Sequence, residues 1–355
     1  MIRLADMAAK DGQFHVVISI IDGIGDGFLA RPLIRFVTAL FPQSSVTVWG
    51  SQPYGRTVFA EFCDRFFPLF AASRRDASYK KAELARLLSQ ITFTQALCWI
   101  SLDPYHPLTE TEQHVLSHLK PAHIWSYGRR AVRRDMATER RMHQADQYFR
   151  LIGEPGVAES IGRRPVIGVG HRTRASAFRD VARQQSKLFI ATHAETGDAK
   201  EWNPPRWAVL VERFFDRSIF VLLGRPEQPL VAFLPKTLLV SDERQDQLAI
   251  LFSSDMFVGI DSCFAHIADA FEIPGVVLFG PTSSEEGGPR AAHLIALTSN
   301  TGQMSDISID ELTEVVQRQV DTLTGGAMAC DMAMPRLLTQ YPGECAEHAG
   351  AANRP

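Results

Sequence analysis

The residues best suited to chemistry follow a predicted buried strand at 255–260. Asp261, a good N-cap residue, and Ser262 come directly before a helical pattern at 262–271. The N–H groups that open a helix lack internal partners and lie at the positive end of its dipole, so this position suits a phosphate group. His266 lies on an apolar face of the helix, where a lone histidine is more often a packed core residue than a catalytic one. The stretch predicts an anion site at the carboxyl end of a strand.

A second candidate is Asp26, in the turn between a predicted strand at 15–21 and a helical pattern at 27–41. By position alone, Asp26 is either an ordinary N-cap or a general base at the mouth of a cleft. A dinucleotide-binding turn would place its third glycine one position later, and an acid at the end of the next strand, where this chain has Trp49. A nicotinamide-dependent oxidoreductase is therefore a disfavoured alternative. The glycines of the turn are Gly23, Gly25 and Gly27.

Two charged side chains follow strands of the second half. Lys200 lies just before a helix that two consecutive prolines open, where its ammonium would add a point charge to a helix start. The alternative is a solvated surface lysine. Glu227 follows the strand at 218–224 and is either a ribose-binding carboxylate or an exposed acid. Trp202 and Trp207 are expected to pack in the core rather than to stack on a base.

Composition and missing motifs exclude several function classes. The net charge is −3, from 37 basic and 40 acidic residues, so we expect no nucleic-acid partner. No apolar run nears the roughly 20 residues that span a bilayer, and the first residues lack a signal-peptide core, so we expect a cytoplasmic protein. Five scattered cysteines without a CxxC pair fit neither a disulfide framework nor a zinc site. Because P-loop and D-x-D motifs are missing, we expect no metal and no bound cofactor.

Six arginines crowd residues 128–141, Arg129 and Arg130 among them. They form either a solvated helix face or a surface that attracts an anionic acceptor or anionic lipid. Any membrane contact would then be peripheral, at the inner membrane face.

Alternating strands and helices must position these residues. In the first half, strands are predicted at 15–21, 46–50, 95–101 and 122–126, and helices at 27–41, 55–62, 78–90, 110–119 and 134–152. In the second half, strands are predicted at 187–193, 218–224, 237–241, 255–260, 275–280 and 293–297, and helices at 204–216, 243–253, 262–271 and 308–323. Such alternation predicts parallel sheets covered by helices on both faces.

The length of 355 residues is sufficient for two domains. We expect an N-terminal domain at 1–160, a C-terminal domain at 161–325 and a tail at 326–355. The stretch 153–186 is rich in Gly, Arg and Pro and lacks clean periodicity, so it is interpreted as the interdomain connection. A short strand at 166–170 is an alternative within it.

Five segments together resemble glycosyltransferase family 9, the ADP-heptose:lipopolysaccharide heptosyltransferase family. They are residues 22–42, 142–155, 192–214, 221–229 and 257–282. One such motif alone is a weak signal, whereas five in the right order with suitable intervals identify the chain as a member. The resemblance implies a GT-B fold: two Rossmann-like α/β domains with parallel sheets that face an interdomain cleft. A C-terminal helix often crosses back to the first domain in this family, and 331–340 would supply it.

The resemblance also implies an activity and its residues. The chain would be an inverting, metal-independent glycosyltransferase that moves a sugar from a nucleotide-sugar donor, such as ADP-heptose, to a hydroxyl of a glycan, lipid-linked or other acceptor. Asp26 would be the general base, Lys200 would neutralise the diphosphate and Glu227 would bind ribose. The other donor-side residues would be Asp261, Ser262, Cys263 and His266, with Thr192, His193 and Glu195 as further contacts. On the acceptor side, the candidates are Gly25 and Gly27 and, from the arginine cluster described above, Arg129 and Arg130.

Two departures from the family pattern lie at the donor site. Cys263 stands where the family usually has glycine, and its side chain could narrow the phosphate site. Ala194 and Glu195 replace the usual proline and glycine. An acid beside a diphosphate is unfavourable unless it serves another contact, such as one to a sugar hydroxyl. These departures keep open a non-catalytic nucleotide-sugar-binding protein on the same scaffold.

Overall fold

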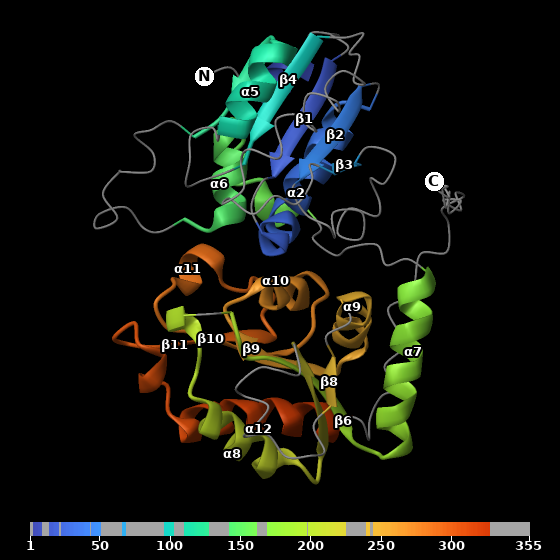
Figure 1. Cartoon of the computed structure of the whole chain (residues 1–355), viewed down its shortest axis with the longest axis vertical. Coiled ribbons are helices and arrows are strands. Elements are labelled where there is room, and N and C mark those ends of the chain that lie inside the picture. Colours follow the sequence, from blue (N-terminus) through green and yellow to red (C-terminus); the bar gives the residue numbers. More distant parts are fainter. Residues whose placement is uncertain are drawn as a thin grey trace, which may run out of the picture.

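Two α/β domains, each built on one parallel sheet, are stacked along the long axis of the molecule in Figure 1. The computed structural model describes residues 3–8, 14–20, 23–42, 44–50, 66–68, 96–102, 110–127, 142–161, 169–196, 198–224, 239–241 and 244–326. Across these ranges, no helix combines the length and the apolar character that crossing a bilayer requires.

The N-terminal sheet has the strand order β3-β2-β1-β4-β5, with every neighbouring pair parallel. The order reverses between β1 and β4, and open α/β sheets bind ligands outside the carboxyl ends of strands at such a switch point. The strands are β1 (Phe14–Ile20), β2 (Ser45–Gly50), β3 (Phe66–Pro68), β4 (Ala96–Ser101) and β5 (His123–Trp125). The helices are α1 (Leu4–Ala8), α2 (Ile24–Leu40), α5 (Glu110–Leu119), α6 (Gln144–Leu151) and the 3-10 helix η2 (Ala158–Ser160).

The C-terminal sheet has the order β11-β10-β9-β6-β7-β8 and is also fully parallel. Its switch point lies between β6 and β9. The strands are β6 (Leu188–His193), β7 (Ser218–Leu223), β8 (Leu239–Ser241), β9 (Met256–Ile260), β10 (Gly275–Phe279) and β11 (Leu294–Thr298). The helical elements are α7 (Val169–Gln184), η3 (Asp198–Lys200), α8 (Pro204–Phe214), α9 (Arg244–Ser253), α10 (Cys263–Ala270), α11 (Ser284–Gly287), η5 (Met304–Asp306) and α12 (Ile309–Gly326).

The sequence patterns give most of these elements correctly. Ten predicted strands correspond to β1, β2 and β4–β11, because runs of β-branched and other apolar residues are buried on both faces of a parallel sheet. Six predicted helices correspond to α2, α5, α8, α9, α10 and α12. Those predicted at 55–62, 78–90 and 331–340 lie outside the described residues. Trp202 and Trp207 pack in the core as expected, each 1% exposed, with ring centroids 5.2 Å apart.

Two predictions are wrong at the junction of the domains. Within the helix predicted at 134–152, residues 142–143 are not helical and α6 begins at Gln144, because the His143 side chain accepts the Ala145 N–H and caps the helix there; residues 134–141 lie outside the described residues. The supposed connection at 153–186 contains helix α7, so Val169 and Gly170 are helical rather than the end of a strand. The buried positions of α7 include two alanines, Ala175 and Ala182, which give little hydrophobic periodicity. The short elements α1, β3 and α11 and the 3-10 helices η2, η3 and η5 were not predicted from the sequence.

The two domains share an apolar contact between α2 and α10. The rings of Phe28 on α2 and Phe271 at the end of α10 meet edge to face, with centroids 6.3 Å apart. Both side chains are buried and belong to a hydrophobic cluster that runs through both domains. This packing holds α2 against α10 at the junction of the two domains (Figure 1).

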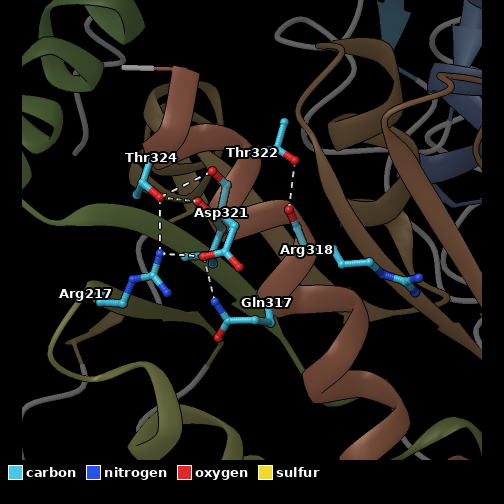
Figure 2. Close-up of polar contacts among 7 residues, drawn as sticks. Arg217, Gln317, Arg318, Asp321, Thr322 and Thr324 are labelled. Carbon is cyan, nitrogen blue, oxygen red and sulfur yellow. Dashed lines mark hydrogen bonds and ion pairs between the residues drawn. The ribbon is translucent and has the colours of Figure 1, made fainter. Parts of the chain in front are cut away.

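The last described helix, α12, is fastened to its own domain on the side away from the junction. The Arg217 guanidinium donates to Asp321 Oδ1 at 2.8 Å and to Thr324 Oγ1 at 3.1 Å, and Gln317 also donates to Asp321 (Figure 2). The Gln317 amide and the Arg217 guanidinium lower the pKa of Asp321. This contact joins the start of β7 to α12 within the C-terminal domain.

Candidate functional site

Lys200 and Asp261 form an ion pair beside the switch point of the C-terminal sheet. Lys200 ends η3 and Asp261 follows β9 directly, and Lys200 Nζ donates to Asp261 Oδ2 at 2.7 Å. The Asp261 side chain is 12% exposed and that of Lys200 is 36% exposed. An ammonium has three N–H donors, so the exposed part of Lys200 can bind a second anion while Asp261 holds it in place. The ion pair holds Lys200 in a defined position, in contrast to the freely solvated surface lysine that was the alternative interpretation.

Five buried polar atoms that have no hydrogen-bond partner among the described residues lie at the carboxyl ends of three adjacent strands, β10, β9 and β6. Buried polar atoms are nearly always hydrogen-bonded, so a group of exceptions marks a place where a ligand or water completes the bonding. Both donors and acceptors are present, which suits a polar ligand with phosphate and hydroxyl groups. The atoms are Thr192 Oγ1, His193 Nδ1 and Glu195 Oε2 around the end of β6, Ser262 Oγ after β9 and Thr282 Oγ1 after β10.

His193 contributes a neutral imidazole to this group. Burial lowers the pKa of His193 to about 4, so the ring is uncharged at neutral pH. Its ring packs on Phe264, with centroids 4.6 Å apart. A neutral imidazole can accept or donate at Nδ1 according to its tautomer. His193 therefore adds hydrogen-bonding capacity to the site without adding charge.

Helix α10 points its N-terminus at the same place. Ser262 is the N-cap, in place of the Asp261 that the sequence suggested, and the Ser262 side chain makes no capping hydrogen bond. Its hydroxyl is therefore not consumed by the helix. Cys263 is the first helical residue and partly exposed. The amides of such a helix start carry partial positive charge, which favours an anion beside Lys200.

Asp26 lies in the first turn of α2 rather than at its cap. Gly23 is the N-cap, so the ordinary capping role considered for Asp26 is wrong. Asp26 Oδ1 accepts a hydrogen bond from Gln144 Nε2 of α6 at 2.7 Å. Among the described residues none donates to Oδ2. The carboxylate is thus oriented on one oxygen and open on the other, as a general base requires.

The turn that carries Asp26 faces the donor-side helix directly. A Cβ on Gly25 would lie 2.6 Å from His266 Cδ2 and 3.3 Å from Cys263 Cα. Glycine at 25 therefore permits this close approach of α2 to α10. His266 lies at the junction of the domains, also near Gly287 of α11, rather than in the interior of one domain. Gly27 is buried within the same turn of α2 and donates to Gly23 O.

A polar contact beside Asp26 also joins the domains; we call it the α6–α11 contact. His143 Nε2 lies 3.0 Å from Gly288 O and donates to it, because Nδ1 already accepts from Ala145 N–H. Arg290 pairs with Asp146 of α6, and its backbone N–H donates to Asp269 Oδ1 on α10. Burial, followed by the nearby Arg290 guanidinium, lowers the pKa of His143 to about 4, so this histidine is neutral at neutral pH.

Several predicted site residues lie outside the described residues: Glu227, Arg129 and Arg130. Other residues at the site were not predicted from the sequence. Gln144, His143, Asp146 and Arg290 act across long sequence separations, so spacing gives no signal for them. Thr282 had a signal, the Gly-Pro-Thr turn that ends β10. Within the described ranges, no group of three or more His, Cys, Asp or Glu side chains is arranged to hold a metal ion.

Comparisons with known proteins agree with this geometry. The family model for glycosyltransferase family 9 (heptosyltransferase) matches residues 118–316, more than half of the chain. A comparison with curated protein sequences found no match.

Three solved structures illustrate the fold. The glycosyl transferase family 9 protein from Veillonella parvula DSM 2008 has a TM-score of 0.69 and 19% identity, covering 86% of this chain and 97% of that one. The E. coli ADP-heptose LPS heptosyltransferase II has a TM-score of 0.65 and 17% identity, covering 87% and 99%. The E. coli heptosyltransferase WaaC with ADP has a TM-score of 0.61 and 15% identity, covering 86% and 99%.

These likenesses confirm the expected fold, two Rossmann-like domains in the GT-B arrangement. The family match supports a transferase and gives no support to the oxidoreductase alternative. The chain belongs to glycosyltransferase family 9 and is a heptosyltransferase-like glycosyltransferase.

Proposed function

We propose that this enzyme transfers a sugar with inversion, and without a metal ion, from a nucleotide-sugar donor to a hydroxyl of a glycan acceptor. ADP-heptose is the first donor to test, since two proteins of the same fold are described with ADP-heptose or ADP. The donor would bind to the C-terminal domain. The acceptor, a lipopolysaccharide core or another lipid-linked or free glycan, would bind to the N-terminal domain, with at most peripheral contact to a membrane.

One observation carries the proposal. Partnerless buried polar atoms, the Lys200–Asp261 pair and the N-terminus of α10 meet at one switch point, and the open carboxylate of Asp26 lies on the helix packed against α10. This combination offers positive charge for a diphosphate, hydrogen-bonding groups for a sugar and a base for the acceptor. Most buried polar groups are hydrogen-bonded within a fold, so a group of exceptions at one sheet edge supports a ligand site there.

The residues fit a single displacement. Asp26 Oδ2 takes the proton of the acceptor hydroxyl while that oxygen forms a bond to the anomeric carbon from the face opposite the diphosphate. The bond between the anomeric carbon and the diphosphate oxygen breaks, and the nucleoside diphosphate leaves with its electron pair. Lys200 and the amides that open α10 stabilise the negative charge that develops there. Because these protein groups stabilise the charge, the proposed step requires no metal ion.

The remaining donor-side groups would recognise the sugar and the nucleoside. Glu195 Oε2 is suited to accept from a sugar hydroxyl rather than to face phosphate, since two anions would repel each other. Asp261 would accept from hydroxyls with the oxygen that Lys200 leaves open. Ser262, Thr192 and His193 would bind phosphate or sugar oxygens. Glu227 is proposed for ribose on the family resemblance alone.

The test is a calorimetric titration with a panel of nucleotide sugars, followed by transfer assays with the best binder. Lys200→Met should weaken donor binding at least about tenfold, because it removes a charge-assisted contact and leaves Asp261 unpaired. The matched control is Lys187→Met, since Lys187 precedes β6, at the opposite end of that strand from the site, and donates to Phe215 O. Its donor affinity should equal that of the wild type.

Equal donor affinity in both lysine variants would defeat the assignment of Lys200. Donor binding without turnover, across a broad set of acceptors, would instead support the non-catalytic binding protein. Product with the same anomeric configuration as the donor, measured by NMR, would rule out a single displacement.

A further inference from the structure

The first turn of α6 supplies a hydrogen-bond donor to Asp26 that the sequence did not reveal. Gln144 Nε2 lies 2.7 Å from Asp26 Oδ1 and 2.5 Å from the hydroxyl oxygen of Tyr148. An ionised carboxylate only accepts hydrogen bonds, so the amide nitrogen of Gln144 must face it. One N–H then points to Asp26 and the other to Tyr148. Both donors of the amide are used, which fixes its orientation.

The scaffold holds Gln144 firmly from both sides. Tyr148, one helical turn further along, is 1% exposed and anchors the amide to the core. His143 and Asp146, which flank Gln144 in the same turn, bind Gly288 and Arg290 of the C-terminal domain. The position of the Gln144 amide therefore depends on contacts within its own helix and on contacts across the domain junction.

The open oxygen of Asp26 has space beside it. Oδ2 lies 3.3 Å from the position that a Cβ on Gly23 would take, and Gly23 is exposed. A side chain at position 23 would crowd the approach to this oxygen. Glycine leaves this side of the oxygen uncrowded.

We propose that Gln144 is a positioning residue for the transfer reaction: it binds Oδ1 of Asp26 and leaves Oδ2 directed at the acceptor hydroxyl. The inference rests on the proposed role of Asp26 as the base. A preset carboxylate avoids a search among side-chain rotamers at each turnover.

The main test compares Gln144→Met with Gln147→Met. Gln147 lies on the same helix and donates to Met142 O, with no contact to Asp26, so it is a matched control. Gln144→Met should lower kcat about 10- to 100-fold, as expected when a charged group loses a hydrogen bond, with the KM for donor unchanged. Gln147→Met should match the wild type in kcat and in the KM for donor.

A second variant separates an electrostatic role from a packing role. Gln144→Glu keeps the shape but replaces the donating amide with a carboxyl group that repels Asp26, so kcat should fall at least as far as in Gln144→Met. Values of kcat equal to that of the wild type in both Gln144→Met and Gln144→Glu would overturn the inference.

A double-mutant cycle distinguishes failure of this inference from failure of the proposed function. If Gln144 acts through Asp26, Gln144→Met should change kcat little in an Asp26→Asn background, where the base is already lost. Additive losses would show that Gln144 acts elsewhere and would overturn the inference alone. Wild-type turnover in Asp26→Asn itself would refute the proposed base, whatever the effect of Gln144.

Discussion

Ser262 shows how a single residue can be tested for function rather than structure. Its hydroxyl is buried, makes no capping bond and has no partner in the part of the chain that the structure describes, so the described fold gains no hydrogen bond from it. Ser262→Ala should therefore leave Tm nearly unchanged. If the hydroxyl binds the donor, the same change should raise the donor Kd about 5- to 30-fold, the effect of one hydrogen bond to an anion.

The matched control is Ser254→Ala, in the turn after α9. Ser254 Oγ donates to Ile250 O at 2.7 Å, so its loss should cost about 1 kcal/mol of unfolding free energy without changing donor affinity. Thermal unfolding and calorimetry on the two variants provide the measurements. A Ser262→Ala protein that is destabilised but binds donor normally would assign this serine to the fold.

At the residue scale, the sequence indicated those site residues that lie close together along the chain or at the ends of neighbouring strands. Asp261 and Ser262 lie together after β9, and Lys200 reaches them because parallel strands end at a common edge. The hydrogen bond between Gln144 and Asp26 joins residues 118 positions apart, and no periodicity encodes such a pair. The capping roles were also misassigned, since Gly23 and Ser262 occupy the caps while neighbouring aspartates match the usual capping preference.

At the scale of elements, the packing of α2 on α10 depends on Gly25. Alanine usually stabilises a helix relative to glycine by about 1 kcal/mol, but here its Cβ would meet His266 and the backbone of Cys263. Gly25→Ala should therefore push the two helix starts apart and lower the transfer rate at least about tenfold. Steady-state kinetics, with Tm measured in parallel, check this expectation.

Gly325→Ala is the matched control for that substitution. Gly325 lies in α12, where an added Cβ meets nothing within 4 Å, so alanine should be neutral or stabilising and leave activity unchanged. Similar stability and transfer rate in the two variants would mean that the close packing of α2 on α10 at Gly25 is not needed for transfer.

Element prediction succeeded where burial is strong and failed where it is weak. The strands β1, β4, β6, β7, β9 and β10 are buried along most of their length, so continuous apolar runs identify them. The buried positions described in α7 are alanines, and Arg179 of α7 donates to Ser253 O at the end of α9. Neither feature produces a hydrophobic periodicity in the sequence. The start of α6 is set by a histidine cap, and histidine is not among the usual capping residues.

For the whole molecule, the α6–α11 contact should make stability depend on pH. The pKa of His143 is lowered to about 4 in the fold, from an ordinary value of 6.5, mainly by burial. Between these values the unfolded chain binds more protons, so stability is full above about pH 6.5 and falls as pH drops toward 4. The loss should be on the order of 3 kcal/mol for this histidine, and buried His193 has the same sign.

His143→Asn tests this dependence, because asparagine can still cap α6 but does not titrate. Unfolding free energies should be measured by denaturant titration from pH 4 to pH 8. The variant should lose less stability than the wild type on acidification, with the remaining slope due to His193 and other groups. Parallel curves for both proteins would show that His143 is not held neutral at the domain junction.

The central claim is that Asp26, on one domain, takes the acceptor proton while the other domain holds the activated sugar. The most direct measurement is the single-turnover rate of Asp26→Asn, with donor affinity determined on the same preparation. The account predicts a rate about 10²- to 10⁴-fold below the wild type and an unchanged donor Kd. A folded Asp26→Asn enzyme that transfers sugar at the wild-type rate would contradict it.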